Sequence, residues 1–427
     1  MSTWFHIRPN SIWRDRALWT LLLSVFIVSL GFGIVVPILP FYVRDIGATP
    51  SQIGLLLSSY ALAQTIAAPL WGFLTDRIGS RAVIAVGTAG LGISLIVFGF
   101  ATKLWVMFAA RMFGGALGTG AVPASLTSAG NVSRPEQRGA AMGMMGAGMG
   151  AGFILGPALG GYLSAWGLAI PFFVAAVTAF IASALAIMLL PAKTPQRTQI
   201  DNSTSEGPGE TSVPGILHGW STPAKLLLGF FLLAALMTSF GDGNRQTAIA
   251  LYSIDLFGMT AEEVGLTLTL MGITYVVAQV AIVGPAVDWI GETAVLSTGL
   301  VLNFVGFGLL LLAVDFWTLT ATICIQGAGM ACIQTSIPSM ISKNAGTHQG
   351  TFMGIRSGLE NASRVAGPIW GGRVYELNPA YPFWTGTFTY GLCILMGGAF
   401  YIVRAVINRS QLPLRPDGDK IMWRGTQ

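Results

Sequence analysis

Six charged residues interrupt otherwise apolar stretches of this 427-residue sequence. They are Arg111, then Asp242 and Arg245, then Arg356, Glu360 and Arg364. Spacings of three and four residues place the members of each group on one face of a helix. Burial raises the pKa of a carboxylate and a nearby cation lowers it, which is the balance that a reversible proton carrier needs. We therefore predict Asp242 and Glu360 as protonatable groups, with structural ion pairing as the alternative.

The composition explains why these charges stand out. Charged residues make up 10% of the chain and apolar residues 53%, whereas a soluble protein carries about 25% charged residues. Such a chain has too little charge for a water-facing surface and too much apolar character for disorder. Its apolar runs are long and unbroken, which predicts membrane-spanning helices. An ionisable group within such a helix costs about 2.5–3.5 kcal/mol on insertion scales, so it is a functional candidate by default.

Stretches with little or no charge divide the chain into twelve candidate spans. Six fit before residue 191, and six follow near 224–254, 263–286, 293–314, 316–342, 349–374 and 380–405. The stretch between them is rich in Pro, Ser, Thr, Gly and charge, which is typical of a flexible linker. We therefore predict an all-α membrane protein with a six-helix half (1–190), a cytoplasmic linker (191–222), a second six-helix half (223–406) and a cytoplasmic tail (407–427).

The distribution of Lys and Arg predicts the orientation of the chain. With twelve spans, sixteen of these residues fall on the side that holds both termini and the linker, and three fall on the other side. Basic loops are retained in the cytoplasm. We therefore expect a multi-pass protein of the cell membrane with both termini in the cytoplasm.

An internal repeat relates the two halves. Gly72-x3-Asp76-x2-Gly79 recurs 212 residues later as Gly284-x3-Asp288-x2-Gly291, and Gly156-Pro157-x2-Gly160-Gly161 recurs 211 residues later, from Gly367. Motifs in the same order at a nearly constant offset indicate two homologous, pseudo-symmetric halves. Transporters built in this way bind substrate between the halves and rock one half against the other.

Four motifs resemble those of the major facilitator superfamily. They are Leu30-Gly31-x5-Pro37-x2-Pro40, Gly72-x3-Asp76-Arg77-x-Gly79-x-Arg81, Arg111-x3-Gly115, and Gly143-x8-Gly152-x3-Gly156-Pro157-x2-Gly160-Gly161. The last resembles the antiporter motif of the twelve-helix drug/proton exporters, a group that includes multidrug and tetracycline exporters. The resemblance implies alternating access driven by the proton gradient, with Arg111 as part of the proton coupling.

The loop motif suggests a gate at the cytoplasmic end of the second helix. A carboxylate at that end can face the N-terminus of another helix or pair with a basic residue. We predict that Asp76 holds the two halves together near Arg356 when the outside is open, and that Arg77, Arg81 and Asp288 also serve the gate. The alternative is that the basic residues of this loop only fix the orientation.

The fifth helix carries a stripe that is nearly free of side chains. Gly143, Gly152, Gly156 and Gly160 form this stripe, and Pro157 permits a bend. We expect the stripe to lie against the other half and to slide, with static packing as the alternative.

The substrate cavity is expected to include Arg245, Arg364, Gln64, Gln279 and Asn361. Many exporters of cationic drugs carry an acidic residue in the first helix, and this chain has none between Asp15 and Asp45. That departure leaves neutral, zwitterionic and anionic substrates open. We predict proton-coupled export of small amphipathic compounds. The alternatives are export of one anionic or zwitterionic metabolite, or a receptor or scaffold built on a transporter fold.

Other chemistries find no support in the sequence. His6, His218 and His348 lack metal-ligand spacing, no Walker motif is present, and the glycine-rich segments lack the strand context of a dinucleotide site. We expect no enzymatic activity, no cofactor, no metal and no nucleic-acid partner. The expected partners are a small-molecule substrate, protons and the lipid bilayer, and the expected state is a monomer.

Overall fold

The computed structural model describes residues 16–134, 137–190 and 222–410, and within these ranges it contains helices and no strand. The first half consists of α1 (Arg16–Asp45), α2 (Pro50–Ile78), α3 (Ser80–Gly99), α4 (Leu104–Gly118), α5 (Ala121–Val132), α6 (Arg138–Ser164) and α7 (Ile170–Leu189). The second half consists of α9 (Thr222–Phe257), α10 (Ala261–Val277), η3 (Ala278–Val283), α11 (Gly284–Ile290), α12 (Glu292–Leu310), α13 (Phe316–Asn344), η4 (Gly346–His348), α14 (Gln349–Leu377) and α15 (Tyr381–Ser410).

These elements make twelve membrane spans, which confirms the predicted fold class. The fourth span breaks at Thr119 and Gly120, between α4 and α5. The eighth span runs through α10, the π-helical segment η3 and α11. Among the described residues, nine helices are long and apolar enough to cross a membrane. Helix α14 is not one of them, because it carries the stripe of Arg356, Glu360 and Arg364.

Two predicted segments fall largely outside the described residues. The predicted linker, 191–222, lies outside them apart from Thr222, where α9 begins. The predicted tail begins at residue 407, but α15 continues to Ser410, and residues 411–427 lie outside the described ranges.

The repeated sequence produces repeated local structure. Gly79 joins α2 to α3 with φ 83° and ψ 155°, and Gly291 joins α11 to α12 with φ 81° and ψ 160°. Glycine adopts this conformation without the steric cost of a Cβ. Capping boxes begin the second span of each half, with Thr49 and Gln52 at α2 and with Thr260 and Glu263 at α10.

Each half is built around an equivalent pair of closely packed helices. Helix α1 packs on α6, and α9 packs on α14. Gly33 faces Gly156 in the first half and Gly243 faces Gly367 in the second, so the backbones approach closely. The repeated motif therefore places glycine where two helix backbones must approach closely, at the equivalent contact in each half.

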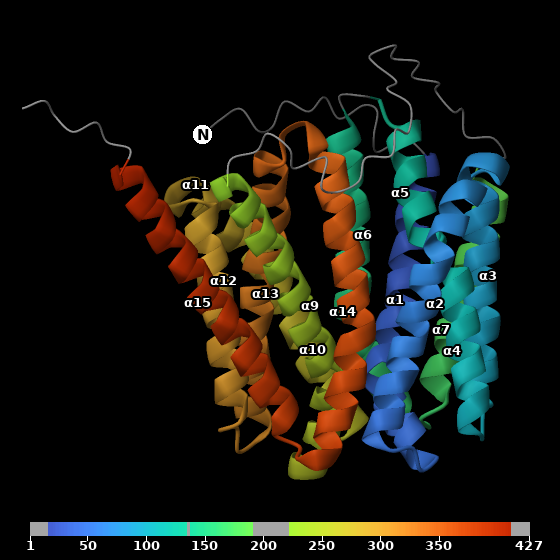
Figure 1. The fold of residues 1–427 in the computed structure, drawn as a ribbon. Coiled ribbons are helices and arrows are strands. Elements are labelled where there is room, and N and C mark those ends of the chain that lie inside the picture. The colour runs from blue at the N-terminus through green and yellow to red at the C-terminus, as the bar shows by residue number, and fades with distance from the viewer. Residues whose placement is uncertain (1–15, 135–136, 191–221, 411–427) are drawn as a thin grey trace, which may run out of the picture.

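The two halves meet at one end of the molecule and separate at the other (Figure 1). Near the closed end, Gly54 of α2 faces the backbone of Pro368 in α14, and α6 contacts α10. Toward the open end, Gly143 of α6 and Gly354 of α14 face open space. Helix α9 begins and α15 ends at the open end, at the top of Figure 1. The surfaces that the halves turn toward each other are called the central faces below.

Candidate functional site

Helix α14 brings two of the predicted charged residues together. Arg356 Nη2 lies 2.6 Å from Glu360 Oε1, and the two side chains are 11% and 16% exposed. The same guanidinium contacts Gln334 of α13 at 3.4 Å. The four-residue spacing makes this pair local to one helix turn. Arg364, one turn further on, is exposed and does not join the pair.

Helix α9 carries the second pair. Arg245 is ion-paired with Asp242, three residues earlier on the same face. Arg245 also donates to the Met271 sulfur of α10 at 3.6 Å. Val36 and Pro37 of α1 line the same small cavity, of about 90 Å³, as this pair. The pair therefore lies where α1 of the first half meets α9 and α10 of the second.

Arg111 of α4 is surrounded differently from the other arginines. Its side chain is 7% exposed, and its guanidinium lies 4.4 Å from the centre of the Tyr60 ring of α2. The Tyr60 ring neighbours Phe32 of α1 at 6.0 Å, and Phe32 neighbours Phe153 of α6 at 5.8 Å. The helices around Arg111 thus supply an aromatic cluster, Phe32, Tyr60 and Phe153, instead of a carboxylate.

Helix α14 contacts α9 on one side and α2 on another, and the predicted cavity residues Asn361 and Arg364 lie between these two sides. Ser363 donates to the Leu236 carbonyl of α9, and Ser58 of α2 donates to the Val365 carbonyl. By helical spacing, Asn361 and Arg364 lie between these two sides, on the central face of the second half.

The two predicted glutamines lie on other helices of the central faces. Gln64 is half-buried one turn after Tyr60 on α2, and Gln279 is exposed in η3. The structure shows no direct contact among Gln64, Gln279 and the charged pairs.

The predicted gating residues lie at the open end and are not gathered there. Asp76 and Asp288 are exposed, and neither forms an ion pair with a residue that the structure describes. The guanidinium carbon of Arg77 lies over the ring of Phe73 on the same helix, at 4.3 Å from the ring centre. Arg81 donates to the Ile187 carbonyl near the end of α7, which satisfies an otherwise free carbonyl of that helix. The contact of Asp76 with Arg356 concerns the opposite conformation, so it stays a prediction.

The glycine stripe of α6 packs differently from the prediction. Gly152, Gly156 and Gly160 face α1 of the same half, and Gly143 faces open space. The contact with the other half is made by the adjacent side of the helix, where Gly161 faces Ala261 of α10. Residues four apart stay on one side of a helix, and position 161 lies about 100° further round. The expectation that the stripe itself lies against the other half is therefore wrong for this conformation.

Sequence reasoning missed a polar network at the closed end. Arg44 Nη1 of α1 lies 2.5 Å from Asp255 Oδ1 of α9. Tyr375 of α14 donates to Asp255 Oδ2 at 2.7 Å. Glu376 accepts from the backbone N–H of Ser51 at 3.0 Å, in the first turn of α2, where helix N–H groups have no internal partner. The sequence could have indicated these residues, because the predicted spans place Arg44, Asp255 and Tyr375 on the same side of the membrane, near the ends of their helices.

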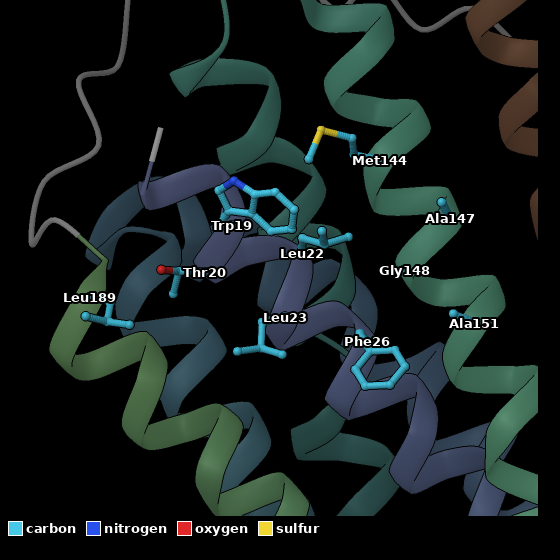
Figure 2. A pocket seen from close by; sticks show the side chains of 10 residues that line it. All are labelled: Trp19, Thr20, Leu22, Leu23, Phe26, Met144, Ala147, Gly148, Ala151 and Leu189. Atoms are coloured by element: carbon cyan, nitrogen blue, oxygen red, sulfur yellow. The ribbon is translucent and has the colours of Figure 1, made fainter. Parts of the chain in front are cut away.

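A large apolar groove lies apart from the charged groups. Its volume is about 690 Å³, and its lining comes from α1, α6 and α7 of the first half. In Figure 2, Trp19, Leu22 and Phe26 of α1 lie across from Met144 and Ala147 of α6. By helical spacing these α6 positions lie on the opposite side of the helix from Phe153. The groove therefore does not open onto the central face.

Comparisons with known proteins agree with this architecture. The sequence profile of the family described as Major Facilitator Superfamily matches residues 21–243 and 231–421. "Multidrug resistance protein 2" of Bacillus subtilis (strain 168) is 27% identical over 88% of this chain and 92% of its own length. "Quinolone resistance protein NorA" of Staphylococcus aureus (strain COL) is 26% identical over 87% of this chain and 92% of its own length.

Solved structures share the fold at lower identity. A peptide transporter, POT, in complex with sulfate has a TM-score of 0.72 at 15% identity, covering 92% of this chain and 95% of its own. The human organic anion transporter MFSD10 has a TM-score of 0.61 at 20% identity, covering 90% and 99%. Both of these solved structures are named as transporters. With the profile match across both halves, the chain belongs to the major facilitator superfamily.

Proposed function

We propose that this chain exports small amphipathic compounds, including drugs, in exchange for protons. The names of its relatives among the multidrug and quinolone resistance proteins support this proposal. The two-half fold supplies the two alternately open states that such exchange needs. The observation that carries the proton coupling is the largely buried pair of Arg356 and Glu360 in α14.

Glu360 is the proposed proton carrier. As a carboxylate it accepts from Arg356, and protonation removes the charge that holds this pair together. Helix α14 also contacts α2 of the other half near Pro368. Glu360 and this contact lie on the same helix, so we propose that the charge change is transmitted along α14 to the closed end. Asp242, paired with Arg245 beside α1, is the second proposed protonatable group.

The described conformation fits the loading state of an exporter. The excess of basic residues on the side of the termini supports a cytoplasmic location for the open end. A substrate would then enter between the central faces from the cytoplasm. Asp76, exposed in this state, is the proposed latch of the opposite state, with Arg356 as its partner. We further propose the cell membrane as its location and a monomer as its working unit.

Proton release tests the proposal directly. Everted vesicles would be energised to an acid interior, and a fluorescent pH reporter would follow release on addition of cationic, neutral and anionic amphiphiles. We expect release with the intact protein and none with Glu360→Gln. Lys103→Gln is the control, because it removes an exposed charge that forms no ion pair with a described residue. Equal release by Glu360→Gln and the intact protein would overturn the assignment of Glu360.

A further inference from the structure

The charges of the spans do not balance on the central faces. Both acids there are already paired, Asp242 with Arg245 and Glu360 with Arg356. Arg111 and Arg364 remain without an acidic partner in the part of the chain that the structure describes. A cation left without an acid in a low-dielectric region favours the entry of an anion and opposes that of a cation.

Arg111 is the more deeply placed of these two arginines. Its Nε is buried and has no hydrogen-bond partner among the described residues. The guanidinium carbon lies over the Tyr60 ring, and a cation–π contact of this kind does not use the N–H donors of the guanidinium. A guanidinium held in this way presents parallel donors that match the two oxygens of a carboxylate.

The aromatic cluster beside Arg111 provides a surface for the rest of such a ligand. Phe153 ends the chain of rings that runs through Phe32 to Tyr60, and it is 44% exposed. Phe153 lies between the side of α6 that contacts α1 and the side that contacts α10. An aromatic ring stacks on such a surface in offset or edge-to-face geometry. A ring and an acid group on one small molecule would therefore meet both features.

We propose that Arg111, Tyr60, Phe32 and Phe153 form a subsite for aromatic anions, in which the guanidinium binds the acid group and Phe153 contacts the ring. The inference deepens the proposed function, and it rests on the central faces being the transport route. It assigns to Arg111 a role in binding, which suits a group that keeps its proton at ordinary pH. Arg364, across the interface, adds to the positive potential that draws the anion in.

A matched set of probes tests the subsite by binding alone. Calorimetry on the purified full-length protein would compare 2-naphthoate, the neutral 2-naphthamide and the cationic 2-naphthylmethyl-trimethylammonium. We expect 2-naphthoate to bind most tightly. Arg111→Gln should weaken 2-naphthoate about tenfold or more, as loss of a charge-assisted hydrogen bond does, and should leave 2-naphthamide unchanged. Arg111→Lys should recover part of the affinity, because it keeps the charge and loses the planar fork.

Two further variants separate binding from folding. Phe153→Leu should weaken 2-naphthoate and 2-naphthamide alike, because it removes the ring contact and keeps the charge. If Arg111→Gln does not fold, Arg111→Lys and Phe153→Leu still decide the proposal. Equal affinity for all three probes, or equal loss of all three in Arg111→Gln, would overturn it.

The proton-release assay distinguishes this inference from the proposed function. Arg111-dependent binding of 2-naphthoate without proton release in everted vesicles would keep the subsite and contradict antiport. Proton release with neutral or cationic amphiphiles, together with no preference for 2-naphthoate, would keep antiport and overturn the subsite.

Discussion

Arg44 of α1 and Asp255 of α9 join the two halves through an ion pair at the closed end, with 2.5 Å between Nη1 and Oδ1. Tyr375 of α14 donates to the same carboxylate. One acidic group thus links three spans from both halves. Because this contact joins the two halves at the closed end, we expect it to favour the conformation described here over one in which this end is open.

Removing this ion pair should shift the population toward opening at this end. The side chains are partly exposed, at 42% and 28%, and such pairs contribute about 0–1 kcal/mol. We therefore expect Arg44→Gln to raise the open population by up to about fivefold. Spin labels at Leu55 of α2 and Ile369 of α14 would report it as a longer distance. Lys103→Gln, the same charge change without an ion pair, should have no effect; an equal shift in that control would refute the role of the pair.

Glycine-to-alanine substitutions should show which close backbone contacts join the two halves and which lie within one half. A Cβ at Gly54 would meet the Pro368 carbonyl of the other half at 2.2 Å, and a Cβ at Gly160 would meet the Ile34 carbonyl of the same half at 2.2 Å. Gly54→Ala should therefore favour opening without lowering Tm. Gly160→Ala should lower Tm, since overpacking costs about 1–3 kcal/mol.

Thermal unfolding and label distances would be measured together for these glycine variants. Gly143→Ala is the control, because a Cβ there meets nothing within 4 Å. A lower Tm for Gly54→Ala than for Gly160→Ala would contradict the assignment of these contacts.

A double substitution should test whether Glu360 serves only as the structural partner of Arg356. Glu360→Gln leaves Arg356 buried without its acid, and breaking a buried pair costs about 3–5 kcal/mol. Removing both charges, in Arg356→Gln with Glu360→Gln, should recover most of that stability. If Glu360 carries protons, the double variant is stable and still fails to release them. A stable double variant with normal proton release would make the pair structural.

Asp76→Asn should abolish transport and leave stability unchanged. Asp76 is exposed and forms no ion pair with a residue that the structure describes, so its loss breaks no described ion pair of this state. The proposed latch to Arg356 would be lost in the opposite state. Uptake into everted vesicles and Tm would be compared with those of Asp76→Glu, which keeps the charge. Normal uptake by Asp76→Asn would reduce the motif to a role in orientation.

Charge-free stretches indicated the spans, repeated motifs indicated the two halves, and helical spacing offered the two local ion pairs as the alternative to protonatable groups. Partners such as Arg356 and Glu360 lie one turn apart on one helix, so their meeting follows from helix geometry. The repeated glycine motifs likewise indicated two similar halves before any contact was known. The break between α4 and α5 and the π-helical η3 were not predicted, because neither changes the apolar character of its span.

Tertiary structure decided which residues meet across helices. Arg44 and Asp255 are remote in the sequence and meet because their helices end side by side at the closed end. Arg111 faces an aromatic ring and not an acid, because α2 is the helix beside it. Gly152, Gly156 and Gly160 face α1 because close packing of the backbones fixes which side of α6 turns toward that helix. Local spacing determines the face on which a residue lies, and only the packing of distant helices determines what that face meets.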